Sequence, residues 1–557
     1  MRRIGMIVAA ALMLLCVVSA SAQAQEKLSV RRADGIGESV CMWEKSNGQK
    51  YLFLPAYMEG QTLVLHYEGI DSVRLGEMDL GSDAQTDAIM ADATLTLLQG
   101  NRQESLIVMQ SQNLPAVHVR TESGSLDYIH EQKGNQERGS MTIVTADGVV
   151  NYEGEVEKIK GHGNATFVYD KKSYQIKLDK KTPLLGMDAG KSYVLLANQH
   201  ENSLLRNRIT LELAREVGLP YTSECRSVDL YVNEEYRGSY LLCDKVTIAS
   251  GSVDVVESKD EIEALNDELV KRNITPDAYG SNDYAKGTHK GVEWPRELSD
   301  VTGGYLFELE YSQRYADEVS GVVTQRGQAV VVKEPEMMTV AQGEYAAALL
   351  ESFERAIFAP DGVDSETGRH YTQMADLNSL VRKYMIEEIS KNYDANKSSQ
   401  YFFKDSDAVD PLIYAGPVWD YDSAWGNYAR EGTNLSAAKP DDLSVAEGGF
   451  DYSWWPALAK QQDFAEAVQK TWTEVYCPLL HVLTGEWAAP AECGIKTLNE
   501  YAKELEASAN MNFVRWRVLN HNSRAVKTGA TYEENIKYLR EWIKARTEFL
   551  DTCWGAG

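Results

Sequence analysis

The pattern of apolar and polar residues predicts strands in the first half of the chain and helices in the second. Residues 156–160 and 174–178 alternate strictly between apolar and polar positions, which is typical of strands with one buried face. A helix is predicted over 203–217, because Gly218 and Pro220 follow it as stop signals. Further strands are predicted at 116–119, 140–144, 227–232, 238–243 and 305–309, and further helices at 345–358, 377–390, 464–483 and 532–553. This order predicts a two-lobed α+β protein with a β-rich N-lobe and a helical C-lobe.

Two segments differ from this main pattern. Between residues 27 and 112, short apolar runs are separated by Gly, Asp and Asn, so we expect a small all-β accessory module there. Residues 257–299 are polar and rich in charge, with several glycines near their end. Such a composition indicates a solvated insertion within the larger domain.

The N-terminus has the features of a secretory signal peptide. Arg2 and Arg3 precede an apolar run at 4–18, and Ala20-Ser21-Ala22 supplies small residues at the spacing that signal peptidase reads. The run is shorter than the roughly 20 residues that a membrane span needs. We therefore expect residues 1–22 to be removed, and we expect a mature chain that has no transmembrane span. It would be exported to the periplasm, the cell surface or the medium.

Composition and charge narrow the classes of partner. The 557 residues are 43% hydrophobic and 25% charged, as in an ordinary globular protein. The 56 basic and 83 acidic residues give a formal net charge of −27. A field of this sign repels nucleic-acid backbones and anionic lipids, so we expect no nucleic-acid partner.

A turn rich in glycine after residue 160 is a candidate phosphate site. The sequence Lys160-Gly161-His162-Gly163-Asn164-Ala165-Thr166 ends a predicted strand, and the exposed amides of such a turn can hold a phosphate. It is not a dinucleotide fingerprint, because Thr166 replaces the third glycine and a strand follows it. Lys177 lies one short hairpin further on and could supply a cation. The pattern alone favours Lys177 as an outward-facing residue of an amphipathic edge strand.

Three aspartates are the candidates for acid chemistry. Asp394 follows a predicted helix, and Asp420 and Asp422 follow an apolar segment, so ordered elements can hold all three in place. Rigid carboxylates can coordinate a divalent metal or orient an attacking hydroxyl. Equally, such residues can simply cap turns. No Gly-x-Ser-x-Gly motif is present, and nothing places two acids across a sugar as a glycosidase requires, although the many acids and aromatic residues leave that class open.

Taken together, these segments closely resemble the CotH family of atypical, protein-kinase-like secretory kinases, first known from spore coats. The matching segments, in the family's order, are Lys160 to Thr166, Tyr174 to Leu178, Ser203 to Asn207, Gly303 to Glu308, Asn392 to Asp394, Gly416 to Asp422 and the closing Trp542-Ile543-x-x-Arg546. The resemblance covers residues 114–554. It implies an atypical two-lobed kinase fold that follows the small all-β module.

The resemblance also implies an activity and a role for each site residue. Members of the family transfer the γ-phosphoryl group of ATP to Ser or Thr of a protein, with Mg²⁺ or Mn²⁺. Asp394 would be the catalytic aspartate and Asp420 the metal ligand, with Asp422 as a second metal candidate. The nucleotide-binding residues would be Lys177, Gly161, Gly163, Asn164 and Arg206.

Two departures from the family pattern leave a second function open. His162 stands where the family commonly has Arg, which replaces a permanent charge with a titrating one. Ser399 stands five positions after Asp394, where a kinase loop places Asn. The alternative is therefore a pseudokinase that binds a cell-envelope component at the cell surface, a compartment in which ATP is scarce.

Overall fold

This computed structural model describes residues 26–163, 165–428, 438–519, 526 and 528–555. The predicted signal peptide and Asn164 lie outside the described residues. Among the described helices, none is both long enough and apolar enough to span a bilayer.

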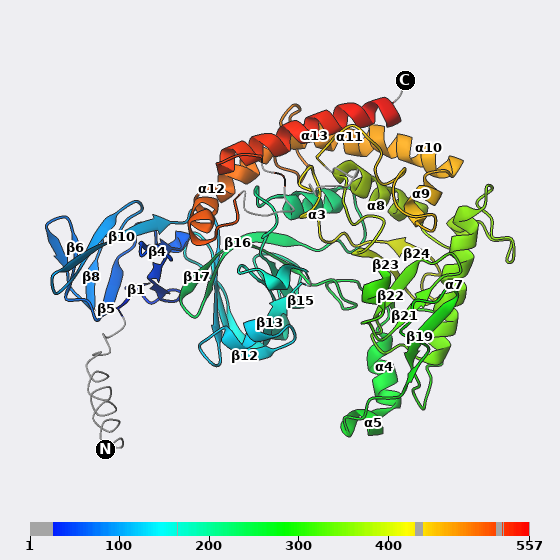
Figure 1. The fold of residues 1–557 in the computed structure, drawn as a ribbon, viewed down its shortest axis with the longest axis horizontal. Coiled ribbons are helices and arrows are strands. Elements are labelled where there is room, and N and C mark those ends of the chain that lie inside the picture. The colour runs from blue at the N-terminus through cyan, green and yellow to red at the C-terminus, as the bar shows by residue number, and fades with distance from the viewer. Residues whose placement is uncertain (1–25, 164, 429–437, 520–525, 527, 556–557) are drawn as a thin grey trace, which may run out of the picture.

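Two small sheets form the N-terminal part of the molecule, at the left of Figure 1. One has the strand order β2-β1-β5-β8, with β1 Lys27–Arg32, β2 Val40–Cys41, β5 Leu63–Glu68 and β8 Ala84–Thr86. The other has the order β3-β4-β10-β9-β6-β7, with β3 Trp43–Glu44, β4 Lys50–Leu54, β6 Ser72–Leu75, β7 Met78–Leu80, β9 Thr94–Gln99 and β10 Arg102–Gln110. They share one apolar core, which includes Leu52, Leu65 and Val108. This part is all-β apart from the 3₁₀ turn Ala56–Met58.

A closed barrel of seven strands follows. Its order is β11-β12-β13-β14-β15-β17-β16, with β11 Ala116–Thr121, β12 Gln136–Val144, β13 Val150–His162, β14 Ser173–Thr182, β15 Gly190–Leu196, β16 Cys225–Val232 and β17 Glu235–Asp244. Parallel pairing of β11 with β16 closes it. The alternation seen in the sequence places Ile159, Ile176 and Leu178 in the barrel core. Helices α2 (Asp127–Glu131) and α3 (Arg206–Glu216) lie in its connections.

The second half of the chain contains a seven-stranded sheet as well as helices. The sheet order is β18-β19-β21-β22-β20-β23-β24, with β18 Ala278–Tyr279, β19 Thr288–Val292, β20 Tyr305–Leu309, β21 Gly321–Val323, β22 Ala329–Glu334, β23 Gln400–Lys404 and β24 Ile413–Ala415. Residues 257–299 hold α4 (Ser258–Leu265), α5 (Asp267–Lys271) and two of these strands. β19 pairs with β21 inside the sheet, so the C-terminal end of this polar segment forms part of the sheet.

The remaining helices cover the sheet and extend over the barrel. They are α6 Ser312–Tyr315, α7 Val340–Phe358, α8 Leu377–Ser390, α9 Trp454–Leu458, α10 Gln462–Thr471, α11 Cys477–Thr484, α12 Leu498–Arg515 and α13 Tyr532–Trp554. A π-helical turn at Trp472–Tyr476 separates α10 from α11, within the single helix predicted at 464–483. Figure 1 shows α13 crossing the top of the molecule, while α12 reaches the barrel and the N-terminal sheets, where it contacts β17 and β10. The prediction of a mixed α+β protein is confirmed.

Candidate active site

A cavity of about 700 Å³ opens between the barrel and the seven-stranded sheet. The end of β13 and the following turn line one side, through Lys160, Gly161, His162 and Gly163. The loops after α8 and after β24 line the other side with three carboxylates: Asp394, Asp420 and Asp422. Two sequence segments more than 200 residues apart are therefore brought to one site.

The two glycines of the turn are required by its shape. Gly163 has a φ of 90°, and a Cβ added there would lie 2.1 Å from Oγ1 of Thr166. A Cβ on Gly161 would lie 2.3 Å from the ring of Phe167. Side chains at either position would collide with the turn, so the backbone at the cavity wall stays uncovered.

His162 lies in this wall as a neutral side chain. Its ring meets that of Trp419 edge to face, with 6.1 Å between the ring centres. Burial, assisted by the positive charges of Lys245 and Lys160, lowers the pKa of His162 to about 4. At neutral pH this residue adds no positive charge to the turn.

Asp394 is held by the loop that ends α8. Lys391 ends the helix in the left-handed conformation, with a φ of 49°. The side-chain oxygen of Asn392 accepts a hydrogen bond from the backbone N–H of Asp394 (3.1 Å), and the Tyr311 hydroxyl donates to Oδ1 of Asp394 (3.3 Å). Burial raises the pKa of Asp394 to about 6, and the negative charge of Asp422 adds to the shift.

Asp420 and Asp422 lie on either side of a firmly anchored tyrosine. Tyr421 is buried, and its backbone N–H donates to Oδ1 of Asn207 at 2.8 Å. Asp420 has a φ of 66°, in the left-handed region, which non-glycine residues seldom occupy and which is found preferentially at functional sites. Asp420 is exposed and lines the cavity. Burial, and then the charges of Asp422 and Asp394, raise the pKa of Asp420 well above its usual value.

One side chain of α8 connects the two aspartate loops. Glu387 accepts hydrogen bonds from the side-chain amide of Asn392 (2.8 Å) and from the hydroxyl of Tyr421. It also pairs with the buried Lys383 at 2.6 Å. Because Asn392 lies two residues before Asp394, and Tyr421 lies between the other two aspartates, Glu387 fixes the spacing of all three carboxylates. Glu387 lies within the helix predicted at 377–390, but the sequence pattern gives it no role.

The donor set fits a hard divalent cation that is shared with a ligand. The negative charge of Asp422 contributes to the raised pKa of both Asp394 and Asp420, so a cation placed among the three carboxylates would be favoured. No set of three or more His, Cys, Asp or Glu side chains in the described part of the chain converges closely enough to hold a metal ion by itself. Magnesium sites that use one or two carboxylates and complete their shell with phosphate oxygens have this character.

Two of the predicted nucleotide-binding residues lie away from the cavity. Lys177 does not line it and instead forms ion pairs through Glu157, whose carboxylate is 2.9 Å from Lys177 and 3.1 Å from Lys191. Arg206 is buried beneath the site, where its guanidinium pairs with Glu201 at 2.9 Å. Gly161 and Gly163 do line the cavity, whereas Asn164 lies outside the described residues.

Other cations occupy the place expected for Lys177. Lys160 and Lys245 line the cavity on the barrel side, and neither ammonium forms a hydrogen bond or ion pair within the part of the chain that the structure describes. On the opposite wall, Lys333 lies 3.6 Å from Glu308, a buried residue whose pKa is raised by burial to about 7. Lys160 and Glu308 both belong to the segments that carry the family resemblance, so the sequence contained a signal for them.

If the cavity holds the ATP that the family resemblance implies, Lys160→Ala should weaken its binding by about tenfold or more, because the variant lacks a cation of the cavity wall. Lys177→Ala removes a lysine from the same face of the barrel, outside the cavity, and should change the affinity by less than about twofold. Isothermal titration calorimetry with ATP and Mn²⁺ compares the two variants directly. A large loss in Lys177→Ala with none in Lys160→Ala would restore Lys177 as the phosphate ligand.

Comparison with known proteins identifies the family of this chain. The family model described as CotH kinase protein matches residues 159–550, which is most of the chain and includes every residue of the cavity walls discussed above. Its match begins at the end of β13, one residue before Lys160, and does not include the N-terminal sheets. None of the curated proteins compared with the chain matches it. The protein belongs to the CotH kinase family.

Proposed function

We propose that this protein is an exported, two-lobed kinase that transfers the γ-phosphoryl group of ATP to a Ser or Thr hydroxyl of another protein. The observation that carries the proposal is the separation of charge across the cavity. Lys160 and Lys245 line the barrel side, while Asp394, Asp420 and Asp422 line the other side. A metal-bound triphosphate has the complementary distribution, with free phosphate oxygens facing the cations and its metal facing the acids.

Each wall then has one part in the reaction. The backbone around Gly161 and Gly163, with Lys160, would hold the phosphates. Asp420 and Asp422 would bind Mg²⁺ or Mn²⁺, which would neutralise negative charge on the phosphates. Asp394 would accept a hydrogen bond from the acceptor hydroxyl and take its proton as the new oxygen–phosphorus bond forms and ADP leaves.

The alternative is a pseudokinase that uses the same domain as an envelope-binding module. It is favoured by the neutral His162 and by Ser399, which lines the cavity in place of a metal-binding amide. Measuring nucleotide binding and phosphoryl transfer distinguishes the two functions. A kinase binds nucleotide only when a divalent metal is present and transfers labelled γ-phosphate to a generic protein acceptor, whereas the binding module does neither.

The metal assignment makes a prediction about Asp420. Asp420→Asn removes an anionic ligand from a hard cation, so Mn²⁺-dependent binding of ATP and phosphoryl transfer should both be lost. The measurement is the rise in melting temperature with ATP, with and without Mn²⁺, since a ligand of the folded state stabilises it by about 2.7 kcal/mol at a hundred times its dissociation constant. If the wild-type protein gains no stability with any divalent metal, the binding-module function replaces the kinase.

A further inference from the structure

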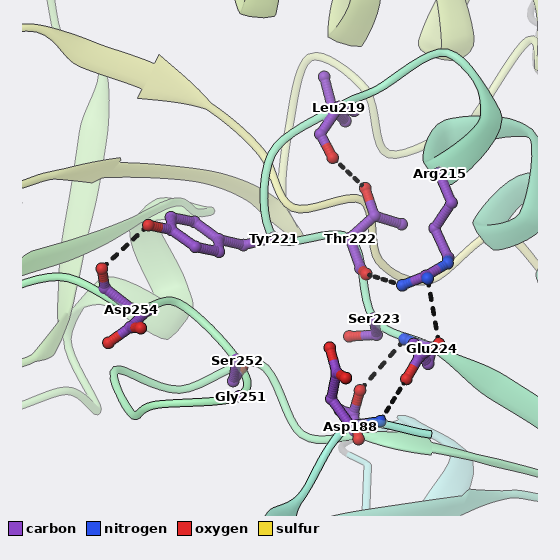
Figure 2. A pocket seen from close by; sticks show the side chains of 11 residues that line it. Asp188, Arg215, Leu219, Tyr221, Thr222, Ser223, Glu224, Gly251, Ser252 and Asp254 are labelled. Atoms are coloured by element: carbon purple, nitrogen blue, oxygen red, sulfur yellow. Dashed lines mark hydrogen bonds and ion pairs between the residues drawn. The ribbon is translucent and has the colours of Figure 1, made fainter. Parts of the chain in front are cut away.

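A second pocket lies at the end of the barrel, apart from the candidate active site. Its volume is about 390 Å³, and it lies where the connection from α3 to β16, the end of β17 and the loop after β17 meet. Figure 2 shows its walls, which are contributed by Asp188, Arg215, Leu219, Tyr221, Thr222, Ser223, Glu224, Gly251, Ser252 and Asp254; Asp244 completes the lining. No residue lines both this pocket and the kinase cavity.

The deepest acid in this pocket has an unused oxygen. Asp244 is only 5% exposed. Its Oδ2 accepts a hydrogen bond from the backbone N–H of Glu224 at 3.1 Å, but its buried Oδ1 has no hydrogen-bond partner among the residues that the structure describes. An unpartnered buried carboxylate oxygen is costly, and proteins normally satisfy it. The carboxylate of Asp244 therefore keeps a hydrogen-bonding capacity that the described residues do not satisfy.

The charges around Asp244 indicate the sign of the charge that a ligand of this pocket would carry. Asp188 and Asp254 are exposed acids at the rim. The single basic residue among the lining residues, Arg215, is already paired with Glu224 at 3.0 Å. Burial raises the pKa of Asp244 to about 7, and the negative charges of Glu224 and Asp188 contribute to the shift. The pocket has an excess of negative charge, so a cation bound there would be favoured.

The shape of the pocket distinguishes an organic cation from a metal ion. A volume of about 390 Å³ is far larger than one ion needs, and in the described chain these acids do not converge as a metal-binding group of three or more. The Arg215 guanidinium, which reaches both Glu224 and the backbone oxygen of Thr222, shows that N–H donors suit the acceptors here. The side chain of Tyr221 adds an apolar wall.

We propose that this pocket binds a small organic cation whose ammonium or guanidinium group donates hydrogen bonds to Asp244 and Asp188. The bound cation would connect the barrel to the loop that contributes Gly251, Ser252 and Asp254. Lys245, the residue after Asp244, lines the kinase cavity. The ligand would thus fix the segment that joins the two sites, and its binding does not depend on kinase activity.

The test is calorimetric titration of the full mature chain with agmatine, which carries a guanidinium and an ammonium and no carboxylate. Putrescine tests whether two ammonium groups suffice, and CaCl₂ tests the metal alternative. Agmatine should bind the wild-type protein, and Asp244→Asn should weaken this binding by about tenfold or more, because a charge-assisted hydrogen bond is lost while the acceptor for the Glu224 N–H is kept.

Two further variants keep the test decisive. Asp188→Asn changes an exposed carboxylate and should fold normally, so it reports on the site even if Asp244→Asn proves unstable; it should also weaken agmatine. Asp87→Asn removes an exposed acid from the N-terminal sheets and should bind agmatine like the wild type. The proposal is overturned if the wild type does not bind agmatine, if Asp188→Asn and every folded Asp244 variant bind it unchanged, or if CaCl₂ binds and displaces it.

Discussion

Asp394→Asn is expected to lower the rate of phosphoryl transfer by about 10²–10⁴-fold, the usual contribution of a positioned general base. The asparagine keeps the size of the side chain and can still accept the hydrogen bond from Tyr311, which lies 3.3 Å from Oδ1. It cannot take the proton of the acceptor hydroxyl. Binding of ATP with Mn²⁺ should survive, because Asp420 and Asp422 remain. Transfer of labelled γ-phosphate and calorimetric binding are measured on the same preparation.

The pH profile separates this chemical role from a structural one. Burial raises the pKa of Asp394 to about 6, so the ionised base is present above this pH and is lost as the pH falls through it. Wild-type transfer should therefore decline below about pH 6, and this acidic limb should be absent from the residual activity of Asp394→Asn. Asp441→Asn, which changes an exposed acid, is the matched control. Full activity in Asp394→Asn would show that another group accepts the proton.

The sequence was sufficient to predict that the three aspartates belong to one site, but it could not show what holds them. Asp394, Asp420 and Asp422 were identified because each follows an ordered segment and matches the family pattern. Their common anchor, Glu387, forms its bonds to Asn392 and Tyr421 only after α8 and the loop after β24 have packed together. Contacts of this kind depend on tertiary structure, and helical periodicity contains no information about them.

The sequence could not show, for a similar reason, that Lys177 lies outside the cavity. Alternation correctly predicts that Lys177 points away from the barrel core, on the same face as Gln175. Which of these positions reaches the cavity depends on the pairing of β13 with β14, where Gln175 lies opposite Lys160 and Lys177 lies opposite Lys158. Gln175 and Lys160 line the cavity, whereas the Lys158 and Lys177 pair lies beyond its edge. Strand register is a long-range property that the local pattern leaves open.

Much of the seven-stranded sheet was also missed by sequence reasoning. β21 has only three residues, and β23 has five and follows the helix predicted at 377–390. Such short apolar runs cannot be assigned to strand or helix by periodicity alone. β20 was predicted because Gly303-Gly304 precede a run that is apolar up to Glu308. The mixed character of the fold and the main helices of its second half could therefore be predicted, but most strands of the sheet could not.

The largest effect on stability is expected for Arg546→Met, on α13. The guanidinium of Arg546 is fully buried and pairs with Glu388 of α8 at 2.9 Å. It also donates to the backbone oxygens of Glu388 (2.6 Å) and Pro440 (2.7 Å). Methionine fills part of the volume but removes the ion-pair partner of the buried Glu388, although the backbone N–H groups of Val445 and Ala446 still donate to it. The free energy of unfolding should therefore fall by about 3–5 kcal/mol.

Two comparisons identify the cause of this loss in urea unfolding followed by circular dichroism. Arg540→Met changes a more exposed arginine of the same helix, bonded to Asn499 on α12, and should cost less than about 1 kcal/mol. Adding Glu388→Gln to Arg546→Met removes the buried negative charge of Glu388, so the double variant should recover part of the stability. Because the backbone of Glu388 leads within six residues to Asp394, the single variant should also lose activity below its unfolding temperature. A cost under 1 kcal/mol for Arg546→Met would mean that water or a rearranged partner satisfies Glu388, and that α13 does not hold the catalytic loop in place.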